Sequence, residues 1–130
     1  MVKPLGIEKQ EGREFFSAYN PTSASYIYDE AGGQAATSGQ FFVEKYDEKI
    51  IQIAIPTLGS TSIDVRIEGR VKDAGSGRWG EVWTKNYAAA TTIDELVVIP
   101  ELLEYIRVGV KVNTNGTDSI TILGSFRKRR

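Results

Sequence analysis

Residues 62–71 read SIDVRIEGRV, and their alternation of apolar and charged side chains predicts the fold class. Ile63, Val65 and Ile67 fall on one face of an extended chain, and charged residues fall between them on the other face. Successive side chains of a β-strand point to opposite faces of its sheet, so a period of two is typical of a strand with one buried face. The stretch therefore predicts a half-buried strand, with one face toward a core and the other toward solvent.

The same alternation recurs along the chain and predicts further strands. Asn115-Gly116 separates the last two of these strands, and this dipeptide favours a tight hairpin between them. No segment has a sustained helical period. The expected strands cover residues 13–19, 25–30, 48–55, 62–71, 79–86, 93–99, 106–112 and 118–126. Their inward positions predict a core of Ile51, Ile53, Ile63, Val65, Ile67, Ile106, Val108, Val110, Ile120 and Ile122, with Gly124 also facing inward.

Two segments of the chain resemble each other in their order of features. Ile55-Pro56 and Ile99-Pro100 each follow one expected strand and precede another, and the two dipeptides lie 44 positions apart. The similarity is either a coincidence between β segments or a sign of two related halves. We predict an all-β fold: an antiparallel two-layer β-sandwich, jelly-roll-like or immunoglobulin-like, with an extended N-terminal arm. The expected divisions are an arm over residues 1–12, a single domain over 13–126 and a basic tail over 127–130.

The composition excludes many kinds of active site. The chain of 130 residues has no cysteine and no histidine, so disulfides, Cys/His zinc sites, thiol nucleophiles and histidine bases are absent. Asp64 and Glu68 fall on the outward face of one strand, a pattern typical of a solvated sheet surface. Asn113, Asn115 and Asp118 are either turn residues or oxygen ligands for calcium. We expect no enzymatic activity, no catalytic residue, no metal site and no cofactor. We also expect no membrane contact.

Charge is distributed unevenly along the chain. The net charge of −1 comes from 16 basic and 17 acidic residues. Since the last four residues are all basic, the remaining chain carries 12 − 17 = −5. This tail is either a solvated terminus or a weak contact with nucleic acid or an acidic surface. Its members are Arg127, Lys128, Arg129 and Arg130.

Aromatic side chains crowd into the first 46 residues, where regular patterning is weakest. Eight of the phenylalanines and tyrosines lie there, together with a loop rich in small residues over positions 31–40. An exposed aromatic row binds sugar rings or bases, whereas a covered row fills a core or a subunit interface. We predict that the arm and some of these aromatic residues contact other chains. The candidates are Phe15, Phe16, Phe41 and Phe42.

A set of motifs in the second half gives a family resemblance. They are IDVRIEGR at 63–70, Trp79 with Trp83, residues 93–100 and YIRVGV at 105–110. With these motifs, the chain from Ser62 to Phe126 resembles small virion structural proteins of tailed phages. The resemblance implies a β-sandwich subunit of a particle, located in the virion, with no catalytic residues.

The expected function is therefore that of a non-enzymatic structural subunit of a phage virion. It would be a capsid decoration or minor head protein, or a head-to-tail or tail component. Its expected partners are copies of itself and other virion structural proteins, which it contacts through its arm and sheet edges. The alternative is a carbohydrate-binding β-sandwich module that uses Trp79 and Trp83.

Overall fold

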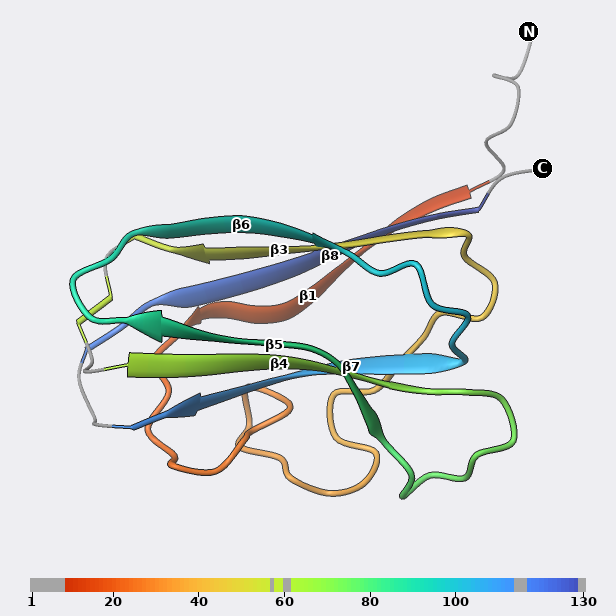
Figure 1. The fold of residues 1–130 in the computed structure, drawn as a ribbon, viewed down its shortest axis with the longest axis horizontal. Helices are drawn as coiled ribbons and strands as arrows, with labels where there is room; N and C mark the ends of the chain where they lie inside the picture. The colour runs from red at the N-terminus through yellow and green to blue at the C-terminus, as the bar shows by residue number, and fades with distance from the viewer. Residues whose placement is uncertain (1–8, 57, 60–61, 114–116, 129–130) are drawn as a thin grey trace, which may run out of the picture.

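The chain folds into two antiparallel four-stranded sheets packed face to face, with no helix among the residues described (Figure 1). The computed structural model describes residues 9–56, 58–59, 62–113 and 117–128. The all-β sandwich expected from the sequence is confirmed. Its strands are β1 (Lys9–Tyr19), β2 (Phe41–Phe42), β3 (Glu48–Ile55), β4 (Ser62–Arg70), β5 (Gly80–Ala88), β6 (Ile93–Val98), β7 (Tyr105–Val112) and β8 (Ile120–Lys128).

The strand order shows that the chain folds back on itself as one long, bent hairpin. One sheet has the order β1-β8-β3-β6 and the other β2-β7-β4-β5, so the first four strands pair with the last four in reverse. β7 and β8 therefore lie in different sheets, and the expected hairpin between them is wrong. Asn115-Gly116, which suggested that hairpin, lies outside the described residues. A local turn signal cannot distinguish a hairpin from a link between two sheets.

The two Ile-Pro segments occupy equivalent places in the fold. Each links a strand of one sheet to a strand of the other, β3 to β4 and β6 to β7. Within the sheets β3 pairs with β6, and β4 pairs with β7. Gln52 lies opposite Leu96, the residue 44 positions further along. This arrangement supports two halves related by an approximate two-fold axis near that pair.

The core lies between the sheets and contains every residue that the alternation predicted for it. All ten predicted core residues are buried, and Phe16 and Phe126 are the largest of the other fully buried side chains. Gly124 faces inward as expected. A Cβ atom there would lie 2.5 Å from the ring of Phe126 and 2.9 Å from that of Phe15. The glycine thus makes room for two aromatic rings in the core.

The structure differs from the expectation at both ends of the domain. Residues 9–12, expected in an arm, belong to β1 and pair with residues 125–128 of β8. Arg127 and Lys128, expected in a tail, are therefore strand residues. In the expected strand at 25–30, only Ile27 forms a bridge, to Val110 of β7. Its neighbours belong to a loop that covers β7 and that we call the strap, residues 20–40 (Figure 1).

Candidate interaction surfaces

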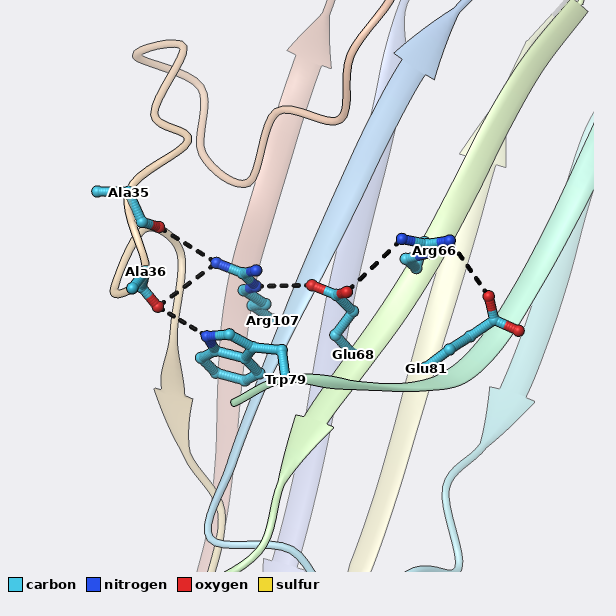
Figure 2. Close-up of polar contacts among 7 residues, drawn as sticks. All are labelled: Ala35, Ala36, Arg66, Glu68, Trp79, Glu81 and Arg107. Carbon is cyan, nitrogen blue, oxygen red and sulfur yellow. Dashed lines mark hydrogen bonds and ion pairs between the residues drawn. The ribbon is translucent and has the colours of Figure 1, made fainter. Parts of the chain in front are cut away.

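A buried polar layer fastens the strap to the outer face of the β2-β7-β4-β5 sheet (Figure 2). At its centre, Arg107 donates from Nε to the Glu68 carboxylate at 2.8 Å. The same guanidinium donates to the carbonyl oxygen of Ala35 at 3.2 Å. The indole of Trp79 donates to the carbonyl oxygen of Ala36 at 2.7 Å. Two side chains on the sheet side thus bind the backbone of the strap.

Glu68 lies between two arginines, and its position corrects an expectation. It is only 7% exposed, whereas the outward position in β4 predicted a solvated carboxylate. Its second oxygen lies 3.7 Å from Arg66, which also contacts Glu81 at 3.3 Å. The strap covers this face and removes the carboxylate from water. Sequence reasoning missed this pair because Glu68 and Arg107 become neighbours only through the β4–β7 register.

Aromatic rings complete the layer. The guanidinium carbon of Arg107 lies 3.7 Å from the centre of the Tyr28 ring and 4.5 Å from that of Trp79. Cations over aromatic faces are stabilised by the ring quadrupole, most strongly where water is excluded. Gly109 of β7 leaves space for the strap, since a Cβ atom there would lie 2.6 Å from Tyr28. The layer therefore joins the strap to the sheet through hydrogen bonds and cation–ring contacts of Arg107, and through the close approach of Tyr28 to Gly109.

Asp64, another carboxylate on this face, also has polar partners within the chain. Asp64 accepts a hydrogen bond from the side-chain amide of Asn86 at 2.6 Å and lies 3.7 Å from Lys111. No cluster of three or more potential metal ligands occurs within the described parts of the chain. Those parts also contain no helix long and apolar enough to span a membrane.

A tyrosine next to β1 predicts how stability depends on alkaline pH. Tyr46 is buried and donates from its hydroxyl to Glu11 at 2.6 Å. Burial, followed by the hydrogen bond and the charge of Glu11, raises the pKa of Tyr46 from 10.0 to about 12. The unfolded chain therefore ionises at this residue before the folded one. The raised pKa stabilises the folded state fully below pH ~10. This stabilisation, about 2–3 kcal/mol of unfolding free energy, is lost as the pH rises toward 12.

Urea unfolding at pH 8 and at pH 11.5 measures this loss. Between the two pH values, the free energy of unfolding should fall less for the Tyr46→Phe variant than for the unaltered chain. The pKa of Tyr87 is also raised, by burial and by its hydrogen bond to Glu95. Tyr87 should therefore cause part of the loss of stability at alkaline pH in both proteins. An equal loss in the two proteins would contradict the assignment to Tyr46.

The outer face of the other sheet, β1-β8-β3-β6, carries an uncovered group of apolar side chains that we call the apolar patch. Leu96 and Val98 of β6 are each 66% exposed, and Ile50 of β3 and Leu123 of β8 are 37% and 39% exposed. Val98 lies directly opposite Ile50 in the register. Four exposed apolar residues in adjoining positions differ from the scattered apolar residues of an ordinary surface.

The four phenylalanines expected at an interface do not form one exposed surface. Phe15 and Phe16 are 6% and 0% exposed within the single chain, which corrects the expectation that they wait for a neighbour. The reason is that β1 pairs with β8 and turns these rings into the core. Phe41 packs against that core, 4.8 Å from Phe126 between ring centres. Phe42, at 38% exposed, is the one of the four that is open to solvent.

The basic residues at the end of the chain are only partly described. Arg127 forms an ion pair with Glu48 on the neighbouring strand β3. Lys128 is exposed. Arg129 and Arg130 lie outside the described residues. The weak contact of this segment with nucleic acid or an acidic surface stays a prediction.

The two tryptophans of the carbohydrate alternative are both half-buried. Trp79 contacts the strap, and its ring centre lies 4.9 Å from the guanidinium of Arg70 as well as 4.5 Å from that of Arg107. Trp83 packs against the core. Each ring is thus partly covered by contacts within the chain.

Comparisons with known proteins find similar structures but no similar sequences. No family model and no curated protein sequence matches the chain. Among solved structures, the SPBc2 prophage-derived protein YomS is similar with a TM-score of 0.51 and 14% identity, over 98% of this chain and 99% of that one. A structure of the infectious bursal disease virus Gx strain gives 0.47 and 12%, over 94% of this chain and 33% of that one. Eiger TNF from S. frugiperda gives 0.45 and 11%, over 91% and 84%. At such identities the likeness to YomS shows a shared fold.

Proposed function

We propose that this chain is a non-enzymatic structural subunit of a phage virion. The observation that carries the proposal is the contrast between the two outer faces of the sandwich. The chain covers one face with its own strap, whereas the apolar patch on the other face stays open. An open patch bordered by polar residues is typical of a surface that binds another protein subunit.

The strand order adds support from architecture. Eight strands in the orders β1-β8-β3-β6 and β2-β7-β4-β5 are arranged as in a jelly roll, an architecture used by viral capsid and lectin domains. The protein YomS, which shares the fold at full length, is prophage-derived. A fold alone does not determine a function. The proposal therefore rests on the apolar patch, and the shared fold agrees with it.

The polar layer argues for a structural rather than a catalytic use of the charged residues. Glu68 is held by two arginines, and Arg107 is held by Glu68 and two backbone carbonyls. A general acid or base needs access to a substrate proton, which these buried and paired groups lack. The proposed partners are further copies of the chain and other virion proteins, and the proposed location is the virion.

Mass spectrometry of purified phage particles tests the proposal. Particles released by the bacterium that encodes the chain, purified on a density gradient, should contain it in a fixed ratio to the major capsid protein. A variant carrying Leu96→Glu in the patch should fold but leave the particle fraction. The matched control is Leu102→Glu, at a residue that is 91% exposed and outside the patch, and it should stay with the particles. If the unaltered chain is absent from the particles, the proposal is wrong.

A further inference from the structure

Within the apolar patch, Ile50 has a projecting side chain on one side and a hollow on the other. In the β6–β3–β8 register, Ile50 lies between Val98 on one side and Ser125 on the other. Val98 projects, with 66% of its surface exposed. On the side of the small Ser125 there is a hollow of about 170 Å³. The hollow is lined by Gln10, Glu48, Ile50, Ser125 and Arg127.

A row here means three outward residues, one each from β6, β3 and β8, that lie side by side in the register. The row next to that of Ile50 carries similar side chains on both sides of β3. Gln52 lies between Leu96 and Leu123, so one amide has an exposed leucine on each side. In the row after that, Ala54 lies between Asp94 and Thr121. A carboxylate therefore lies on one side of β3 and a hydroxyl on the other. All three rows are centred on β3.

Two copies of this face can be placed against each other by a rotation of 180° about an axis that lies between them and runs parallel to β3. In that arrangement the rows of one copy are complementary to the rows of the other. The rotation sets Val98 over the hollow beside the partner's Ser125, and Leu96 over the partner's Leu123. Gln52 then meets its own copy, and Asp94 meets the hydroxyl of the partner's Thr121. Glu48 also meets its own copy, but each is already paired with Arg127. Leu96 thus faces an apolar partner residue and Ile50 faces its own copy, whereas Val98 fits a hollow whose lining is mostly polar. No unpaired like charges meet.

We propose that a second copy of this chain binds the outer face of the β1-β8-β3-β6 sheet and forms a two-fold symmetric dimer about β3. The inference deepens the proposed function, because it names a partner for the apolar patch. An isologous contact of this kind uses the same surface on both subunits, as most homodimers do. The strap prevents the same contact at the other sheet, since it covers the outer faces of β4 and β7.

Sedimentation equilibrium of the purified chain tests the dimer without any particle. We expect a monomer–dimer equilibrium that Val98→Glu weakens at least ~30-fold, as expected when an interface hot spot is removed. Leu102→Glu, the same change at an exposed leucine outside the patch, should leave the equilibrium unchanged. Adding Ser125→Lys to Val98→Glu should restore dimer formation, because the new lysine lies opposite the new carboxylate of the partner.

Crosslinking identifies the axis. The chain has no cysteine, so Gln52→Cys introduces a single thiol next to its own symmetry copy. Facing sheets pack about 10 Å apart, too far for a direct disulfide, so a short bismaleimide is the suitable reagent. It should convert Gln52→Cys to a covalent dimer and leave Thr84→Cys, an exposed position on β5, monomeric. A chain that sediments only as a monomer, or a Val98→Glu variant that dimerises normally, would overturn the inference even if the chain is found in particles. Absence from particles with an intact dimer would overturn only the proposed function.

Discussion

Replacing Phe126 by alanine should lower the free energy of unfolding by about 3–5 kcal/mol. Phe126 is fully buried, and its ring centre lies 4.8 Å from that of Phe41, 5.6 Å from that of Tyr46 and 6.5 Å from that of Phe15. These rings come from three separate parts of the chain, namely β1, residues 41–46 and β8. The substitution therefore leaves a cavity where β1, β2 and β8 meet, and the surrounding strands cannot close it without breaking their pairing.

Urea unfolding monitored by tryptophan fluorescence measures the effect. Domains of this size are stable by only about 5–15 kcal/mol, so the milder Phe126→Leu is measured as well. It should lose less unfolding free energy than Phe126→Ala. Phe42→Ala is the matched control, because Phe42 is 38% exposed and packs on Tyr105 at the surface. A loss at Phe126 no larger than that at Phe42 would show that the aromatic cluster does not support the core.

Glu68→Ala should cost about 3–5 kcal/mol, because it leaves a buried arginine without its counter-charge. Arg107 is 7% exposed, and it would keep the carbonyl oxygens of the strap and two aromatic rings as partners but no carboxylate. The strap should loosen as a result. Limited proteolysis should therefore cut within residues 20–40 of the variant at protease concentrations that leave the original chain intact.

Two controls separate this effect from general damage. Lys72→Ala breaks an exposed ion pair with Glu44 and should change stability by no more than about 1 kcal/mol. The double variant Glu68→Ala with Arg107→Met should be more stable than Glu68→Ala alone, since no unpaired charge stays buried. Equal destabilisation by the double and single variants would show that the ion pair is not the source of the cost.

The sequence allowed the sandwich to be predicted because its strands follow a single rule. In β3, β4, β7 and β8, apolar residues recur at every second position, and that pattern depends only on one buried face. The boundaries of β3 were predicted to the residue. Burial of Ile106 and Val108 followed from the same rule, without knowledge of which strands pair.

What the sequence could not show depends on contacts between distant residues. The outward position of Glu68 in β4 predicted solvent, and only the strap, some 40 positions earlier in the sequence, reverses that prediction. Phe15 and Phe16 were expected at an interface because the first 46 residues lack alternation, yet pairing of β1 with β8 places both rings in the core. The apolar patch escaped notice because Ile50, Leu96 and Leu123 are far apart in sequence and meet only through the register.

The position of β8 has a consequence for the order of events during synthesis. β8 lies between β1 and β3 and pairs with both, although it is the last strand of the described chain. Until residues 120–128 have left the ribosome, β1 has no strand to pair with, and β3 presents an open edge. Strand pairing across so many residues is slow, because loop-closure entropy is lost before the contacts form. We therefore expect the nascent chain to stay incompletely folded, with two unpaired edges exposed, until β8 has emerged from the ribosome.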